Sequence, residues 1–543
     1  MSYLDRPRLH FFGTFTANPS TINNTAANYD MNQPLGPLLW NPTGQHNFSI
    51  NACPITSIVM DGGDTETGTV DTAQTGVLVD LDTEQQMVSM VFGMILEITV
   101  GTASVTGTFR PVNFFDIIFG RANGAGGDEA ASAAYQSVLT DLQWSNASQS
   151  TFLSALYAAS PKMLSIRFIV DGFHNVSHHG RVAGTIGPYF DGEPMTFANA
   201  RFLRPTGLPS QFGPFNYAPA KTDLTRGVIT FDLGNAVPTS WPPNPTPPPN
   251  QSTAYPVAAG FPLQVALIDA NGNPTTFGDF DTSETAYESN AFVQEFQIPP
   301  NASNPLASTP TGIVSPETPG PVVVMMENPT GAYVNSDQYV FRLNPGERGY
   351  VPMWANIFEV PAAGAEIFLY PYPNMLQLAP GAPVGTPSDA VSYPASVTTD
   401  SNGKASFTIH TSDPGNPRGF IDGQVYGIGF TWAQDVTPDP NAYISVHVFQ
   451  QVPVPSEPTW WQDVYPILNQ YSRLYPSMQA RIKLNDYQAV VNSLQPIVQR
   501  LLLDSQTSPQ YMPITRELSR DKTAIILLWA ENGHPEGTPP TTS

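Results

Sequence analysis

The amino-acid sequence predicts a β-dominated multidomain protein with β-sandwich and immunoglobulin-like elements and a small C-terminal helical segment. Its 543 residues exceed what one hydrophobic core holds, so two to four domains are expected. Its 56 prolines and 42 glycines favour turns and edge strands over long helices. We predict an N-terminal β-rich domain with short helices (1–240), a second β-rich region with an immunoglobulin-like part (250–455), a C-terminal helical segment (456–535) and a disordered tail (536–543).

The first predicted strand lies in the opening stretch 3–15, where residues 9–15 are dense in aromatic and β-favouring side chains. Such a run is typical of a strand inserted into a core. Residues 48–60 predict a strand or a pair of strands, followed by a turn at Asp61-Gly62-Gly63-Asp64. Further strands are predicted at 75–81, 88–100, 103–109, 163–170, 262–269, 292–298 and 321–326.

Two short helices are predicted in the N-terminal part. A glycine-rich loop leads into residues 129–142, which we interpret as one helix, and residues 149–159 predict the other. The proline-rich stretch 241–249 is typical of a stiff spacer or long loop. Later in the chain, Asn402-Gly403 predicts a hairpin tip followed by a strand with alternating apolar residues, which resembles a hairpin of immunoglobulin-like domains.

The C-terminal segment carries clear helix signals. Residues 463–474 have a helical pattern, and Asn485 is the predicted N-cap of a second helix with one apolar face. Ser519 is predicted to cap a last helix, which Gly533 ends.

The charge balance excludes two classes of partner. The formal charge of −23, from 45 acidic and 22 basic residues, repels nucleic-acid phosphates and anionic membrane surfaces. No apolar run approaches the roughly 20 residues that cross a bilayer, and the opening stretch lacks the apolar core of a secretory signal, so we expect a cytoplasmic protein. Cys53 is the single cysteine, which excludes an intrachain disulfide.

Three of the eight histidines, His174, His178 and His179, lie in one short stretch and are the candidate metal ligands. On a helix the first two would share a face. The neighbouring glycines predict instead a turn before a strand, in which this spacing loses its geometric meaning. Hydrogen-bonding histidines or adventitious metal binding remain the alternatives.

Three blocks of the sequence carry a resemblance to a known family. They are residues 4–11 (Leu-Asp-Arg-Pro-Arg-Leu-His-Phe), residues 40–49 leading to Met60-Asp61-Gly62-Gly63, and residues 511–519 (Tyr-Met-Pro-Ile-Thr-Arg-Glu-Leu-Ser). In order and approximate spacing they resemble the N-terminal half of the iminophenyl-pyruvate (indole-pyruvate imine) dimer synthases of the violacein and chromopyrrolate pathways. In that family a ferritin-like, iron-binding helical domain follows, and this sequence ends shortly after the third block.

The resemblance implies a scaffold related to enzymes that handle indole-derived pigment precursors. We therefore expect a non-catalytic or auxiliary protein that binds a small aromatic molecule, such as an indole-type pigment, in an aromatic-rich cavity. The candidate ligand-binding residues, from the resembling blocks, are His10, Trp40, His46 and Phe48. The expected cofactor is a bound organic chromophore, with haem on His10 and His46 as the weaker alternative.

Two other functional classes remain open at this point. One is an oxidative enzyme of indole-pigment biosynthesis that acts alone or with a separate ferritin-like partner. The other is a structural or storage protein, for which the low charge content and self-association into a homo-oligomer would be typical.

Overall fold

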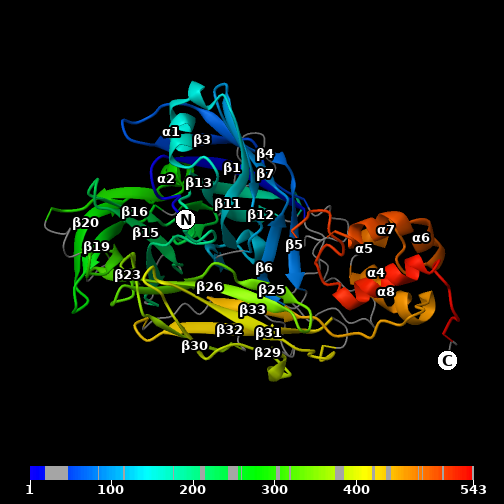
Figure 1. The fold of residues 1–543 in the computed structure, drawn as a ribbon. Helices are drawn as coiled ribbons and strands as arrows, with labels where there is room; N and C mark the ends of the chain where they lie inside the picture. Colours follow the sequence, from blue (N-terminus) through cyan, green and yellow to red (C-terminus); the bar gives the residue numbers. More distant parts are fainter. Residues whose placement is uncertain are drawn as a thin grey trace.

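Figure 1 shows the computed structural model of the chain, which describes residues 1–18, 47–82, 85–113, 116–174, 176–207, 214–242, 255–258, 260–300, 306–316, 320–372, 385–418, 422–435, 442–474, 476–479, 481–503 and 507–540. Strands make up 44% of the structure and helices 15%. The strands form several sheets, and most of the described helices lie at the C-terminal end. The predicted β-dominated multidomain fold is therefore confirmed.

The first sheet closes on itself. Its strand order is β13-β12-β11-β8-β7-β4-β3-β1-β2-β5-β6, with β9 paired to β11, and β1 pairs with β13 as well as with β3. The opening stretch thus supplies a central strand, as predicted. The bounds are β1 (Arg8–Asn18), β2 (Asn47–Ile50), β3 (Cys53–Val59), β4 (Gly68–Gln74), β5 (Gly76–Asp82), β6 (Gln85–Phe92), β7 (Ile95–Val100), β8 (Ala103–Phe109), β9 (Asp116–Ile118), β11 (Ser132–Ser145), β12 (Leu164–His174) and β13 (His179–Pro188).

The interior of this sheet is an apolar core that α1 (Thr151–Ala159) covers with Phe152, Leu153 and Leu156. Aromatic rings stack inside it, including Phe15 and Phe48 at 5.6 Å between centroids. Helix α1 matches the predicted helix at 149–159. At the start of α1, the Glu66 carboxylate accepts three hydrogen bonds, from Ser150 Oγ and from the amides of residues 151 and 152.

The predicted helix at 129–142 is wrong, because this segment forms strand β11. Residues 132–139 are all buried and pair with β12, and the strand also pairs with β8. A strand that is buried on both faces has no polar alternation, so its periodicity does not distinguish it from a buried helix. Pairing with two neighbours then outweighs the helix propensity of its alanines.

The second sheet has the order β20-β19-β22-β23-β14-β15-β16-β21 and includes strands from both sides of the boundary that we placed at 240–250. Helix α2 (Glu284–Asn290) contacts β1 from this part. A small sheet joins β10 (Ala122–Asn123), β17 (Thr239–Ser240) and β18 (Val257–Ala258). The strands of the second sheet are β14 (Arg201–Pro205), β15 (Ala218–Asp223), β16 (Val228–Asp232), β19 (Leu263–Ile268), β20 (Pro274–Phe280), β21 (Val293–Gln297), β22 (Thr311–Ser315) and β23 (Val322–Glu327).

Two five-stranded sheets share one apolar core and form a sandwich between residues 332 and 448. One has the order β24-β26-β31-β29 with β27 paired to β26, and the other has the order β25-β33-β32-β28-β30. The strands are β24 (Ala332–Ser336), β25 (Val340–Leu343), β26 (Arg348–Ile357), β27 (Val360–Pro361), β28 (Glu366–Pro371), β29 (Val391–Ser392), β30 (Ser396–Thr398), β31 (Lys404–Thr411), β32 (Gln424–Trp432) and β33 (Tyr443–Val448).

The Asn402-Gly403 turn is not the tip of a hairpin. Strand β31 follows it as predicted, but β30 before it pairs with β28 in the opposite sheet. The chain therefore crosses from one sheet to the other at this turn. Asp400 Oδ1 accepts hydrogen bonds from the amides of Asn402 and Lys404, which stabilises the turn.

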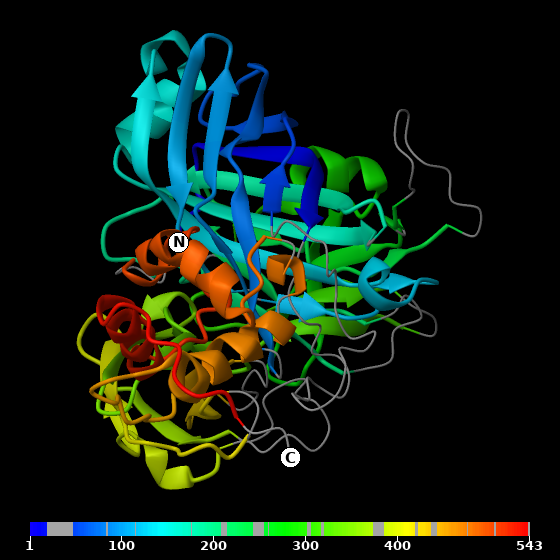
Figure 2. The same ribbon diagram turned by 90° about the vertical axis from the view of Figure 1, so that its right-hand side faces the viewer.

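The C-terminal helices pack against strands β5 and β6 of the first sheet (Figures 1 and 2). Val79, Leu81 and Phe92 from these strands share an apolar cluster with Trp460 and Trp529. Ser519 caps the last helix as predicted, while Asp486, one residue after the predicted Asn485, caps α6. The elements are a π-turn (Trp460–Val464), α4 (Tyr465–Leu474), α5 (Pro476–Gln479), α6 (Tyr487–Asn492), α7 (Leu494–Leu501) and α8 (Arg520–Glu531); 3-10 turns lie elsewhere at Gly127–Glu129, Ala147–Gln149 and Ser388–Ala390.

Residues 536–540 differ from the predicted disordered tail. The amide of Trp461 donates to the carbonyl of Glu536 at 3.1 Å, and the Gln462 side chain donates to the carbonyl of Thr538 at 2.6 Å. The helical segment therefore orders this part of the tail. Within the described ranges, none of the helices combines the length and the apolar character that crossing a membrane requires.

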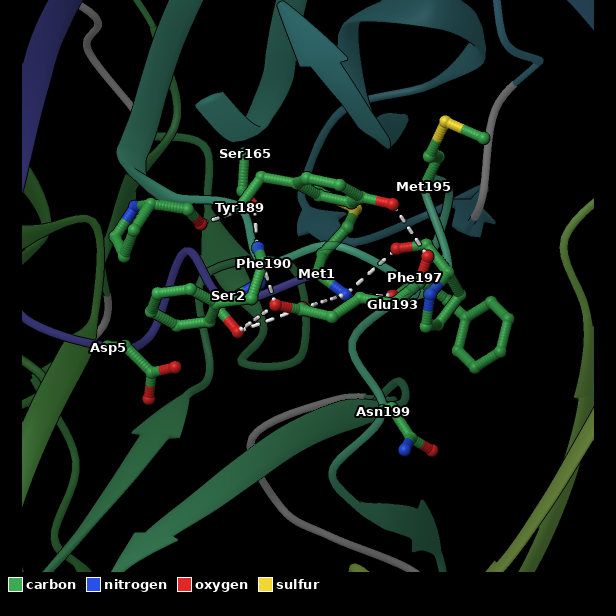
Figure 3. Close-up of polar contacts among 12 residues, drawn as sticks. Met1, Ser2, Asp5, Ser165, Tyr189, Phe190, Glu193, Met195, Phe197 and Asn199 are labelled. Atoms are coloured by element: carbon green, nitrogen blue, oxygen red, sulfur yellow. Dashed lines mark hydrogen bonds and ion pairs between the residues drawn. The ribbon is translucent and has the colours of Figure 1, made fainter. Parts of the chain in front are cut away.

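The first residues of the chain are anchored by polar contacts with residues 193–197, as Figure 3 shows. The Met1 ammonium group donates to the carbonyls of Pro194 at 2.9 Å and Phe197 at 3.0 Å and pairs with Glu193. The Ser2 hydroxyl contacts both Glu193 oxygens at 2.8 Å. This part of the chain is therefore a packed element of the fold.

Candidate ligand-binding site

The first resembling block, residues 4–11, has a structural role. The Arg6 and Arg8 guanidinium groups both pair with Glu295 on β21, and Lys221 on β15 pairs with Asp5 at 2.5 Å. The Tyr3 hydroxyl donates to Asp232 at 2.7 Å. These contacts join the beginning of β1 to the second sheet, so the charges of the block are used for packing.

His10 and Phe48 lie on opposite faces of the first sheet. Phe48 is 1% exposed and lies opposite Ala17 in the interior core. His10 points to the other face, where its Nδ1 lies 2.9 Å from Thr185 Oγ1. The structure therefore does not bring these two candidate ligand-binding residues together, and the other two, Trp40 and His46, lie outside the described residues.

The surroundings of His10 do not fit haem. The residue is 1% exposed, and burial, with a smaller effect of the Arg8 charge, lowers the pKa of its imidazole well below the ordinary value. Its Nε2 is buried and has no hydrogen-bond partner among the described residues. A ring nitrogen enclosed in this way offers no open side from which a macrocycle could approach.

The three clustered histidines lie at the end of the hairpin formed by β12 and β13. His174 ends β12 and lies opposite His179 on β13, while His178 takes a left-handed conformation in the turn. His174 pairs with Glu129, and His179 Nδ1 contacts the carbonyl of Ser177 at 2.8 Å. Among the described residues no three His, Cys, Asp or Glu side chains are grouped to hold a metal ion. The metal-site hypothesis therefore finds no support in the described residues.

A cavity of about 320 Å³ lies among the C-terminal helices and is the best candidate for a ligand-binding site. Its volume falls at the small end of the range for ligand pockets. Helices α4, α5, α7 and α8 and the segment 509–518 provide its walls. The apolar wall residues include Leu468, Ile482, Ile497, Met512, Ile514 and Ile526.

The local sequence explains why this space is not filled by side chains. Helices α6 and α7 are separated at Ser493, and the prolines Pro496, Pro509 and Pro513 prevent the neighbouring backbone from forming one continuous helix. Short helices and irregular turns pack less tightly than two long helices. The third resembling block, residues 511–519, forms one wall of the resulting cavity through Met512, Pro513, Ile514 and Leu518.

Polar groups are few and lie around the apolar walls. Tyr471 is buried and donates its hydroxyl hydrogen to the carbonyl of Glu517 at 3.0 Å. Burial raises its pKa well above the ordinary value, and the neighbouring Glu517 adds to this, so the phenol stays neutral. Arg500 donates to the carbonyl of Gln510 at 3.3 Å, and Arg481, which is exposed, completes the cationic side of the cavity.

This cavity was not predicted from the sequence. The sequence predicted a helix with one apolar face in this region and assigned no ligand to that face. The sequence feature that indicates a cavity is the apolar helix face together with Pro496, Pro509 and Pro513, because helices interrupted by prolines pack together less closely. The candidate residues that were chosen instead came from the resemblance.

Comparisons with known proteins do not assign the chain to a family. No family model matches it, and no curated protein matches it. Among solved structures, domains 4 and 5 of the S-layer protein SbsC match with 8% identity, 46% of this chain and 98% of that chain covered, and a TM-score of 0.15. The CupB6 tip adhesin from Pseudomonas aeruginosa matches with 7% identity, 82% and 100% covered, and a TM-score of 0.15. Likenesses with such low TM-scores support no common fold and no common function.

Proposed function

We propose that this chain is a non-catalytic or auxiliary protein that binds a small aromatic compound, of the indole or indole-pigment type, in the cavity among the C-terminal helices. The proposal includes the cytoplasm as its location. The observation that supports it best is the cavity itself, which combines apolar walls from four helices with a few peripheral polar groups.

The lining of the cavity favours a flat apolar ligand. Leucine, isoleucine, methionine and proline side chains form most of it, and the walls are closed behind by buried residues such as Ile526, which is 1% exposed. Methionine side chains adapt to irregular ligands and make favourable contacts with aromatic rings. A bicyclic aromatic molecule would remove its own surface and that of the walls from water.

The chemistry of the lining supports holding a ligand over transforming it. Among the described residues that line the cavity there is no His, Cys, Asp or Glu, the side chains that usually transfer protons or act as nucleophiles. The two guanidinium groups of Arg481 and Arg500 would attract a ligand with a carboxylate. An indole that carries a carboxylate therefore fits both parts of the lining.

Binding of indole and of indole-3-carboxylate, measured by isothermal titration calorimetry on the full chain, tests the proposal. For the nine non-hydrogen atoms of indole, roughly 0.5 kcal/mol each gives about 4–5 kcal/mol, or a Kd near or below about 1 mM. Ile497→Phe adds volume to the cavity wall, and we expect it to weaken binding at least tenfold.

A matched substitution controls for unspecific effects. Leu502→Phe changes the end of the same helix at a residue that is 59% exposed and does not line the cavity, and it should leave the affinity unchanged. The absence of saturable binding of either probe, or equal affinities for wild type and Ile497→Phe, would refute the proposal.

A further inference from the structure

One wall of the apolar cavity comes from an irregular segment of the chain. Residues 508–516, which we call the wall segment, lie between α7 and α8, and Pro509, Met512 and Ile514 of this segment line the cavity. Regular helix packing does not fix the course of such a segment. The shape of the cavity on this side therefore depends on the other contacts that the wall segment makes.

The wall segment lies against the first sheet at the turn between β6 and β7. Gly93, in this turn, has a φ of 67°. A Cβ atom added to Gly93 would lie 2.5 Å from Cγ and 2.7 Å from Cβ of Pro509, so the proline ring lies directly on the glycine backbone. Carbon atoms in normal contact are about 3.5–4.0 Å apart. A glycine at this position is therefore what leaves room for Pro509.

A second contact joins the far end of the wall segment to the same strand. The guanidinium carbon of Arg516 lies 3.7 Å from the centre of the ring of Phe92, the residue before Gly93. Arg516 also donates to the carbonyl of Ser508 at 2.7 Å, which ties the two ends of the segment together. Phe92 and Gly93 thus support both ends of the wall segment.

The turn that supports the segment is fixed from two other strands. The side-chain amide of Gln74, at the end of β4, donates to the carbonyl of Gly93 at 2.8 Å. The amide of Phe109, at the end of β8, donates to the carbonyl of Met94 at 2.9 Å. When the turn and the wall segment no longer fit each other, the irregular segment is therefore the part that we expect to move.

We propose that Gly93 is a positioning residue for the ligand-binding cavity: because it carries no side chain, it sets where Pro509 lies and, through the wall segment, the shape and affinity of the cavity. This inference rests on the proposed function and adds to it that the first sheet controls ligand binding from outside the cavity. Pro509 contacts Gly93 and also lines the cavity, so a displacement of its ring changes the cavity directly.

A proline transmits such a displacement to the backbone. Its ring is closed onto the backbone nitrogen, so it does not rotate away from a new neighbour as another side chain does. A methyl group on residue 93 would have to displace the ring by about 1 Å to reach a normal carbon–carbon contact. The backbone of the wall segment moves with the ring.

The coupling between the turn and the cavity acts in both directions, because linkage between two sites is reciprocal. A ligand that holds the wall segment in its native position also favours the contact between Pro509 and Gly93. Ligand binding should therefore slow the hydrogen exchange of the amides in the β6–β7 turn.

The test is isothermal titration calorimetry of the full chain with indole and with indole-3-carboxylate, for wild type, Gly93→Ala and Gly101→Ala. Gly101, in the turn between β7 and β8, has a φ of 58°, and a Cβ atom added there would have no neighbour within 4 Å. Both variants bear the strain of a side chain at positive φ, but only Gly93→Ala displaces Pro509. We expect Gly93→Ala to weaken binding about tenfold or more and Gly101→Ala to bind as wild type does.

Pro509→Gly separates a positioning role from a general loss of stability. It removes Cβ, Cγ and Cδ of Pro509, the atoms that a side chain on residue 93 would meet. In the Pro509→Gly background, Gly93→Ala should therefore change the affinity by less than about twofold. Hydrogen exchange of the wild type gives a second measurement should Gly93→Ala fail to fold: saturating ligand should slow exchange in the β6–β7 turn and leave the β7–β8 turn unchanged.

The outcomes distinguish this inference from the proposed function. If wild type binds neither probe saturably, the proposed function fails, and the role of Gly93 fails with it. If wild type binds a probe, the role of Gly93 alone is overturned by any of three results: Gly93→Ala binds as tightly as Gly101→Ala, Gly93→Ala weakens binding equally with and without Pro509→Gly, or the ligand leaves exchange in the β6–β7 turn unchanged.

Discussion

Glu359 provides a prediction about the pH dependence of stability. Its side chain follows β26 in the sandwich and accepts a hydrogen bond from the amide of Thr222, on β15 of the second sheet, at 2.8 Å. Arg201 Nε lies 4.0 Å away, but that arginine pairs more closely with Glu327 at 2.6 Å. Burial raises the pKa of Glu359 to about 7, from an ordinary value of 4.5, against the attraction of Arg201.

The direction of the change in stability with pH follows from proton binding. Since the folded state holds the proton of Glu359 more tightly than the unfolded state, the group reduces the free energy of unfolding as pH rises from about 4.5 to about 7. The change in pKa from 4.5 to about 7 corresponds to about 3 kcal/mol at most. The part that falls between pH 5 and pH 8 is about 2 kcal/mol after allowing for the 19% exposure of the side chain.

Glu359→Gln keeps the acceptor for Thr222 and removes the titration. Urea unfolding of wild type and variant at pH 5 and pH 8, followed by tryptophan fluorescence, measures the effect. The variant should gain about 2 kcal/mol relative to wild type between the two pH values. A difference between the two proteins that stays constant from pH 5 to pH 8 would refute the reasoning, whatever the stability of each.

Three other predictions concern groups that the fold buries or uses. Asp171 binds Arg181 at 2.8 Å and Arg121 at 3.3 Å, so Asp171→Asn should lose about 3–5 kcal/mol in chemical unfolding, and a loss below about 1 kcal/mol would contradict an essential ion cluster. Glu66→Ala should lower the free energy of unfolding by about 1–2 kcal/mol, because three donors at the start of α1 lose their acceptor. This prediction is wrong if Glu66→Ala and Glu66→Gln both unfold like wild type. Burial raises the pKa of the Cys53 thiol to about 12, so a thiol reagent at pH 8 should modify it only on unfolding, and rapid labelling of the native protein would show a more open β3.

The parts of the fold that were predictable carry a local signature. Alternating apolar residues with glycine or proline at their ends correctly indicated strands such as β8 and β19, and Ser519 indicated the start of α8. Strand β11 was missed because both of its faces are buried, and the Asn402-Gly403 turn was misread because its local chemistry is the same whether the flanking strands share a sheet or not. Both errors concern which strands pair, and pairing is set by tertiary contacts.

The candidate sites were less predictable because their residues meet only in space. The residues that line the apolar cavity lie between Leu468 and Ile526, on four helices and one irregular segment, and no spacing rule connects them. The histidines were chosen because they are close in sequence, but among the described residues no group of three metal-ligating side chains forms around them. Residues 511–519 are the exception, since this block, noted for its resemblance, provides one wall of the apolar cavity.

The most direct test of the central claim is mass spectrometry of what the protein releases on denaturation, together with its absorption spectrum, after purification from its native source. The account predicts a small aromatic molecule that accompanies the wild-type chain and is depleted in Ile497→Phe purified in the same way. A wild-type protein that releases no such molecule, or an Ile497→Phe variant that retains it fully, would contradict the claim that the C-terminal cavity is a ligand-binding site.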